Sequence, residues 1–390
     1  MVAAALVGLT ALGAVLFALD QSDAPTELST DAAENPPESV RPPVAPAPTD
    51  GTPTTAPATR TLRTFPVVAV AGEEYLVWAG EAGENDISQR ADGFAVNLSS
   101  GAVRAIPVAP IDPRSGATGV WTGEELIVCC GTGPADTRSA AAWDPGTSQW
   151  RELARPPESI ARFHVAAVWT GDIMVVVAPG PAVASYDPAA DRWIEHPAPP
   201  RLDRSPEAVW TGSEVVVWDS TYGSGIRGPG LAPEVADRGW RWAPGDPEWR
   251  PLPELPENAR TRMGSMVWTG RELVVWGQST SDDAIGAGAR WRPGDAGWRP
   301  ISPSPQGPVD DPYNGTPGSQ ALAATDGGRV LVRGIEGGRL AAGTYLYDPE
   351  ADTWTNIAIA LDGYHPSITV AGDQILVPDE ARPIAGTLAS

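Results

Sequence analysis

The sequence predicts an all-β propeller, a ring of small four-stranded antiparallel sheets packed face to face. A stretch found in its fullest form at residues 267–277 recurs in variant form from residue 70 to residue 378. Its return strand, residues 273–276, is apolar at successive positions, which indicates that both faces of the strand are covered. The chain also holds 42 glycines and 42 prolines among 390 residues, and a fold with many tight connections needs them.

Each copy of the repeat is predicted to form two hairpins. The first turns at a glycine, which allows the positive φ of a tight turn, and an apolar or aromatic residue follows three positions later. These glycines are Gly72, Gly123, Gly171, Gly212, Gly270, Gly327 and Gly372. The second hairpin carries two apolar residues seven positions apart, at Val96/Val103, Trp143/Trp150, Tyr186/Trp193, Trp242/Trp249, Trp291/Trp298 and Tyr347/Trp354.

The repeats predict seven blades, with six as the alternative. Six units are complete, and residues 367–378 supply half of another. A strand from residues 382–390 and one from residues 61–65 would complete a seventh blade shared between the termini, because a propeller has to close into a ring. The propeller is therefore expected to span residues 61–390.

The N-terminal part is predicted to hold the propeller at a membrane. Residues 1–19 are uncharged and almost wholly apolar, and about 19 residues are just enough to span the hydrocarbon core as a helix. A cleaved signal peptide is the alternative, and a start codon upstream would account for the missing basic residues before the run. Residues 20–60 are rich in proline and acidic residues, which predicts a disordered linker. The propeller would then lie on the extracytoplasmic side of the cell membrane, anchored by one helix.

Charge and cysteine content limit the possible partners. The net charge of -22 argues against nucleic acid and anionic lipid, since both bind clustered cationic side chains. The chain has only two cysteines, Cys129 and Cys130, so no disulfide framework supports the fold. We expect them to be buried thiols, with neighbouring side chains on opposite faces of a strand.

These repeats resemble the Kelch repeat, found in the central domain of galactose oxidase and its bacterial relatives. The resemblance rests on the apolar hairpin that ends in Trp-Gly or a related pair, on Tyr-Asp-Pro, and on the tryptophan seven residues after the tyrosine, and it covers residues 65–378. The chain departs from the pattern where the double glycine is reduced or missing, as at Val217-Trp218-Asp219, and where the first blade lacks its aromatic pair. These departures affect blade boundaries more than the architecture.

The two faces of such a ring differ. One carries the tight Thr-Gly and Asp-Pro turns, and the other carries the long segments 81–92, 220–238, 279–288 and 303–320, where recognition is expected. On this second face an arginine precedes the innermost strand in four blades, and a histidine stands near the same place in the last; they are Arg114, Arg162, Arg204, Arg262 and His365. They could form a cationic rim for an anionic ligand such as an acidic glycan. Alternatively, each arginine bonds a neighbouring blade's carboxylate or loop carbonyl and only fixes the spacing, and the Kelch pattern often has an arginine here irrespective of ligand.

The sequence favours a binding or scaffold protein that recognises a protein or a cell-envelope glycan. The three histidines, His164, His196 and His365, are scattered, and no spacing of metal ligands, phosphate loop or nucleophile elbow is found, so no catalytic residue, metal or cofactor is predicted. The copper site of galactose oxidase has no matching residues, because Cys129 falls inside a predicted blade strand. The alternative is a carbohydrate-active enzyme, of the oxidase, lyase or epimerase type, with its site at the mouth of the channel. A sensor that relays binding across the membrane is a third possibility.

Overall fold

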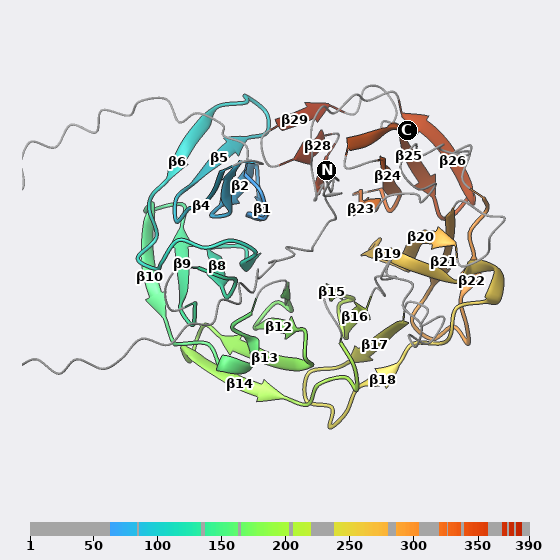
Figure 1. Ribbon diagram of the computed structural model, residues 1–390, viewed down its shortest axis with the longest axis horizontal. Coiled ribbons are helices and arrows are strands. Elements are labelled where there is room, and N and C mark those ends of the chain that lie inside the picture. Colours follow the sequence, from blue (N-terminus) through green and yellow to red (C-terminus); the bar gives the residue numbers. More distant parts are fainter. Residues whose placement is uncertain are drawn as a thin grey trace, which may run out of the picture.

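The computed structural model shows a ring of β-sheets around a central axis (Figure 1). It describes residues 63–83, 86–133, 137–162, 165–202, 206–219, 238–279, 286–303, 320–325, 327–336, 339–357, 369–372, 374–377 and 380–383. The predicted membrane span and linker, residues 1–19 and 20–60, lie outside these ranges. Within them, no helix has the length and apolar character needed to span a bilayer.

Six sheets have four strands each, in which neighbouring strands run antiparallel. The first three blades are β1 (Val67–Ala71), β2 (Glu74–Trp78), β5 (Gly93–Asn97) and β6 (Val103–Ile106); β7 (Thr118–Trp121), β8 (Leu126–Cys129), β9 (Ala140–Asp144) and β10 (Gln149–Leu153); and β11 (Ala166–Trp169), β12 (Met174–Ala178), β13 (Ala182–Asp187) and β14 (Arg192–His196).

The next three blades are β15 (Glu207–Trp210), β16 (Val215–Asp219), β17 (Arg238–Trp242) and β18 (Arg250–Pro251); β19 (Thr261–Trp268), β20 (Leu273–Ser279), β21 (Gly286–Trp291) and β22 (Arg299–Pro300); and β23 (Gln320–Ala324), β24 (Val330–Glu336), β25 (Arg339–Asp348) and β26 (Thr353–Ile357). A small extra hairpin, β3 (Glu81–Gly83) and β4 (Asp86–Gln89), follows β2, and two short 3-10 helices, η1 (Glu158–Ile160) and η2 (Glu257–Ala259), connect blades.

The ring has six complete blades, which was the alternative blade number. A further sheet of three strands, β27 (Thr369–Ala371), β28 (Gln374–Val377) and β29 (Glu380–Pro383), lies between the sixth blade and the first (Figure 1). Of the predicted closing strand at residues 61–65, residues 63–65 are described, and they do not join this sheet. Thr64 instead pairs with Glu81 of the first blade through two backbone hydrogen bonds, and Arg63 is bound to the carbonyl of Ala79.

The strand pairing confirms the two-hairpin repeat. Trp143 pairs with Trp150, Tyr186 with Trp193 and Tyr347 with Trp354 across the third and fourth strands. Where the fourth strand is short, the aromatic rings still meet: the ring centroids of Trp242 and Trp249 are 5.6 Å apart, and those of Trp291 and Trp298 are 6.2 Å apart. In the first blade the equivalent pair is Val96 and Val103.

The second strand of each blade is buried on both faces, as its unbroken apolar sequence predicts. All five residues of β12 and of β16 are buried. Because side chains alternate along a strand, Val176 packs against the second blade, whereas Val175 and Val177 pack against the fourth. Each such buried valine contributes about 1.5–3 kcal/mol relative to an exposed one. We call the apolar contact between two neighbouring blades a seam.

In the outer part of five seams, a tryptophan of one blade is hydrogen-bonded to the preceding blade. In blades two to six the fourth-strand tryptophan donates its indole N–H to a backbone carbonyl just after the fourth strand of the preceding blade. The pairs are Trp150–Pro107, Trp193–Ala154, Trp249–Pro197, Trp298–Pro253 and Trp354–Ser302, with Nε1–O distances of 2.7–2.9 Å. The first blade has Val103 at this position, so its seam with the three-stranded sheet lacks this bond.

A second hydrogen bond repeats nearer the axis. The backbone N–H of Gly80, Gly131 and Gly180 donates to the carbonyl of Arg114, Arg162 and Leu202 respectively, in the next blade, at 3.0 Å in each case. All three glycines have positive φ, and a Cβ at Gly80 or Gly131 would stand 2.7 Å from a backbone oxygen. Only glycine fits at these two positions.

We expect the indole bonds to contribute measurably to stability. Trp193→Phe removes the donor to Ala154 while keeping an aromatic ring, and should cost about 1 kcal/mol more than Trp169→Phe, because a lost hydrogen bond is worth roughly that amount. Trp169 is a matched control, since it packs against the same apolar cluster and its indole nitrogen bonds no described residue. Thermal and urea unfolding of the two variants measures the difference. Equal losses for the two substitutions would show that the bond contributes nothing.

Candidate functional site on the long-loop face

The long-loop face is formed by the connections between second and third strands and by those between blades. Of the five side chains predicted to lie here, Arg114 and Arg162 are fully described. Arg262 lies in β19 and only its backbone is described, while Arg204 and His365 lie outside the described residues. The predicted side chains that are described therefore belong to the second and third blades.

Arg114 is buried, and its guanidinium is hydrogen-bonded within the fold. Its side chain is 0% exposed, and the guanidinium donates to the backbone carbonyls of Asp112, Cys130, Thr137 and Ser139 and to the Ser139 hydroxyl, at 2.6–3.5 Å. Four of these bonds tie the segment before β7 to the ends of β8 and β9 in the same blade. This side chain fixes the spacing of segments within its own blade, whereas the alternative role expected from the sequence was a bond to a neighbouring blade.

Arg63 has the same role in the first blade, and its position was not among the predicted ones. Its guanidinium donates to the carbonyl of Ala79 at 3.1 Å, as Arg114 does to Cys130, and also to Asp92 at 3.2 Å. The signal for it was present in the sequence, because Arg63 precedes Gly72 by nine residues, the spacing of Arg114 to Gly123.

The Asp92 carboxylate joins the buried Arg63 to the half-exposed Arg90. Its two oxygens accept from Nε and an Nη of Arg90, each at 3.0 Å, in a bidentate pair. Burial acts to raise the pKa of Asp92, but the hydrogen bonds and charges of Arg90 and Arg63 outweigh it and hold that pKa below its ordinary value. The first blade thus presents an ion-pair network in which two guanidinium groups share one carboxylate.

Arg162 is different, because its side chain is exposed and its charge is available. Its Nε donates to the carbonyl of Ser159 at 3.0 Å, and this is the one bond its guanidinium makes with described residues. An added Cβ at Gly180 would come within 3.7 Å of an Arg162 Nη, so the absence of a side chain at Gly180 leaves room for the guanidinium above that turn. The backbone carbonyl of Arg162 is meanwhile bound by Gly131.

Arg138 lies close to this position. It is half-exposed and forms a long ion pair, 3.8 Å, with Glu158, a side chain that is itself 87% exposed. Glu158 and Ser159 belong to η1, the short helix that carries the carbonyl to which Arg162 is bonded. An exposed pair of this length is weak, so an anionic group could replace Glu158 at little cost. Sequence spacing did not single out Arg138 or Arg90, although both stand two or three residues before a third strand.

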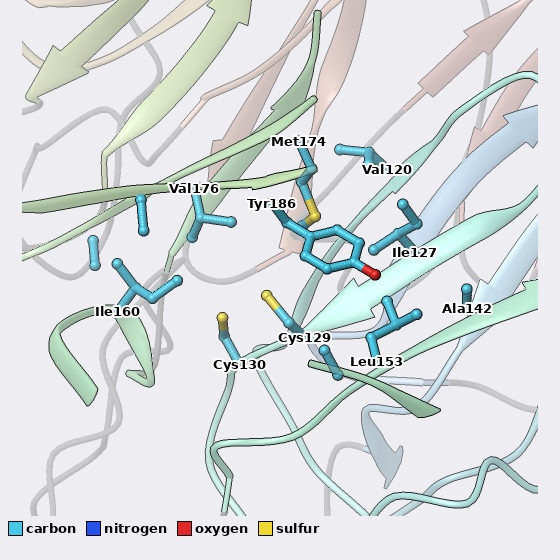
Figure 2. Packing of buried hydrophobic residues seen from close by; sticks show 13 residues of the cluster. Val120, Ile127, Cys129, Cys130, Ala142, Leu153, Ile160, Met174, Val176 and Tyr186 are labelled. Atoms are coloured by element: carbon cyan, nitrogen blue, oxygen red, sulfur yellow. The ribbon is translucent and has the colours of Figure 1, made fainter. Parts of the chain in front are cut away.

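The two cysteines lie in the apolar core and not at this face. Cys129 and Cys130 are free and fully buried in the seam between blades two and three, beside Leu153, Ile160 and Tyr186 (Figure 2). The prediction of buried thiols is confirmed, and burial raises the pKa of Cys130. Their side chains do not point to opposite faces, however. Cys130 directly follows the strand and has a φ of 67°, and this turn of the backbone brings both residues into one cluster.

Titratable groups elsewhere in the described part of the chain serve the fold. His196 bonds the Ser185 hydroxyl at 2.7 Å, lies 4.9 Å from the ring of Trp242, and has its pKa lowered by burial. His164 and His365 lie outside the described residues. Among the residues that the structure describes, no three His, Cys, Asp or Glu side chains are grouped so as to hold a metal ion.

What this part of the face offers chemically is the exposed guanidinium of Arg162, with the half-exposed Arg138 near it. A guanidinium binds carboxylate, sulfate or phosphate groups through paired hydrogen bonds, and the terminal nitrogens of Arg162 bond no residue that the structure describes. The arginines of the tight-turn face contrast with it, because they pair with glutamates of the first hairpin, in the pairs Arg104–Glu74, Arg151–Glu125, Arg241–Glu214, Arg250–Glu214 and Arg292–Glu272.

Comparison with known proteins shows the fold. No family model matches the chain, and no curated protein matches it by sequence. Among solved structures it is similar to YjhT, with a TM-score of 0.52 and 13% identity over 77% of this chain and 99% of that one. It is also similar to a fungal alcohol oxidase of the AA5 family, solved in complex with copper, with a TM-score of 0.59 and 13% identity over 85% of this chain and 72% of that one. Both likenesses fit the galactose-oxidase-like propeller that the repeats resemble, and at this identity they establish architecture only.

The contrast between two arginines can be tested by stability. Arg114→Ala should lower the free energy of unfolding by about 2–4 kcal/mol, because several buried carbonyls lose their donor. Arg162→Ala, at the same place in the next blade, should change it by about 0.5 kcal/mol or less, since the side chain is exposed. Denaturant unfolding of both variants measures this, and a similar loss for both would mean that Arg162 is also a spacer.

Proposed function

We propose that the chain is a binding propeller that recognises an anionic cell-envelope glycan through its long-loop face, with Arg162 and Arg138 as the principal contacts. The observation that carries the proposal is the exposed guanidinium of Arg162, held on a rigid rim with its terminal nitrogens unused by described residues. In a protein of net charge -22, an exposed guanidinium whose terminal nitrogens bond no described residue is the feature that selects for an acidic ligand.

The geometry supports ligand binding more than catalysis. The blades hold the rim fixed through regular seams, and the rim presents hydrogen-bond donors of fixed charge. The polar side chains of η1 are already engaged, since Ser159 donates to Glu195 at 2.6 Å and Glu158 is paired with Arg138 at 3.8 Å. This set can orient a carboxylated sugar or a protein carboxylate, and we favour the sugar.

The proposed localisation of the propeller is the outer side of the cell membrane. Its basis is the apolar run at residues 1–19 and the proline-rich segment at 20–60, which could place the propeller well clear of a bilayer. Alkaline carbonate extraction of membranes tests this localisation. The chain should remain in the pellet and be cut by protease added to spheroplasts, and release into the supernatant would exclude an integral anchor.

Glycan binding is tested with the full chain reconstituted in nanodiscs and probed with carboxylated, sulfated and neutral glycans. The anionic glycans should bind in preference, and added salt should weaken the binding because exposed charges are screened. Arg162→Ala should reduce the affinity at least tenfold. Arg299→Ala, which removes an equally cationic side chain that is 49% exposed on the tight-turn side of an outer strand, should leave it unchanged.

Two results would overturn the proposal. One is equal binding of neutral and anionic glycans, and the other is unchanged binding by Arg162→Ala. Chemical conversion of a bound glycan during the assay would instead favour the carbohydrate-active enzyme, and mass analysis of the recovered glycan detects it.

A further inference from the structure

A groove opens on the tight-turn face, at the seam between the first blade and the three-stranded sheet. Its volume is about 450 Å³. Val70, Gly72 and Leu98 line it from the first blade, and Ala371, Gly372 and Gln374 line it from the other side. It lies on the opposite face from Arg162, so it is independent of the site proposed above.

The groove lies where the first blade lacks an aromatic side chain that most other blades have. Val70 stands two residues before its hairpin glycine, and blades two to five have a tryptophan at that position, Trp121, Trp169, Trp210 and Trp268, while the register of the sixth blade places Ala324 there. The register confirms the equivalence, because Val70 pairs with Tyr75 as Trp121 pairs with Leu126. Each of the four tryptophans packs against the apolar cluster of the seam it faces. At the first blade the indole is missing and the seam is open at that point.

The same seam also lacks the second aromatic contact. Val103 replaces the fourth-strand tryptophan that donates an indole N–H in the other blades. An apolar cluster that includes Tyr75, Val77 and Leu376 lies in this seam, and Gln374 Nε2 donates a hydrogen bond across it to the Leu98 carbonyl at 2.7 Å. The deeper part is therefore closed, while the rim at the turns is left hollow.

The rim of the groove is suited to an aromatic ring with a hydrogen-bond donor. A Cβ added at Gly72 or Gly372 would meet no atom within 4 Å, so a flat ring can approach the turn backbones. Since Gln374 uses its Nε2 on Leu98, its Oε1 is left as an acceptor. Glu73 lines the groove and is exposed, which favours a cationic group beside the ring.

We propose that this groove is a docking site for a tryptophan side chain presented by a basic segment of a partner protein. The chain's own repeats identify the occupant, because an indole fills the equivalent place in four other seams. The indole of the partner restores the missing contact between Val70 and the three-stranded sheet, and its N–H is directed to Gln374. The basic flanks of the segment lie beside Glu73.

The test uses the tripeptide amide Arg-Trp-Arg with a 5-fluoro-indole, observed by ¹⁹F NMR with the full chain in neutral-lipid nanodiscs. The fluorine signal should broaden and shift on titration, and unlabelled Arg-Trp-Arg should reverse the change whereas Arg-Leu-Arg should not. Empty nanodiscs give the blank. Val70→Trp places an indole from the chain itself in the groove, so it should weaken peptide binding at least tenfold while keeping or raising Tm.

A second variant avoids any change in the core. Ser99→Tyr adds a ring at an exposed turn residue on the edge of the groove and should also weaken binding, whereas Ser213→Tyr, at an exposed turn residue of the fourth blade, should not. The proposal is overturned if the peptide fails to bind at millimolar concentration, if Arg-Leu-Arg competes equally, or if folded Val70→Trp and Ser99→Tyr bind as the natural chain does. Concentration-dependent dimerisation abolished by Ser99→Tyr would overturn it in favour of a second copy as the occupant.

Discussion

The fold depends on the need to cover both faces of every blade. A second strand such as β12 is apolar on both sides, so a single blade cannot exist alone in water, and each blade is completed by its two neighbours. Stacking around a ring is the arrangement that covers every face without leaving an open stack. The indole bonds at the outer edge and the glycine bonds nearer the axis then fix the spacing that the apolar contacts leave adjustable.

The two kinds of arginine on the long-loop face follow from this spacing. Arg63 and Arg114 turn inward and satisfy carbonyls at the ends of the second strands, where the backbone leaves the sheet. Arg162 occupies the equivalent position in the third blade, but its side chain turns outward over Gly180. A buried guanidinium needs several acceptors to offset the loss of water, and the first two blades provide them. Position in the repeat therefore does not decide whether an arginine side chain is buried and bonded to the fold or exposed at the surface.

Much of the fold was predictable from the sequence, and the candidate site was predictable only in part. The hairpin glycines and the aromatic pairs recur in most copies of the repeat, so they can be recognised even where one copy is irregular. The closing strand was placed wrongly because residues 61–65 look like a strand locally, while the bonds that hold Arg63 and Thr64 involve residues about 15 positions further on. The orientation of Arg162 relative to Arg114 depends on side chains contributed by neighbouring loops, and spacing alone does not encode it.

Residue 162 contributes to the ring through its backbone and not through its charge. Its carbonyl oxygen accepts the Gly131 N–H and so belongs to the joint between two blades, and every one of the twenty amino acids has a backbone carbonyl. Its side chain takes no part in that joint. The joint therefore places no demand on side-chain identity at this position, and a substitution there can change the chemical group exposed on the surface while the contact between the two blades is kept.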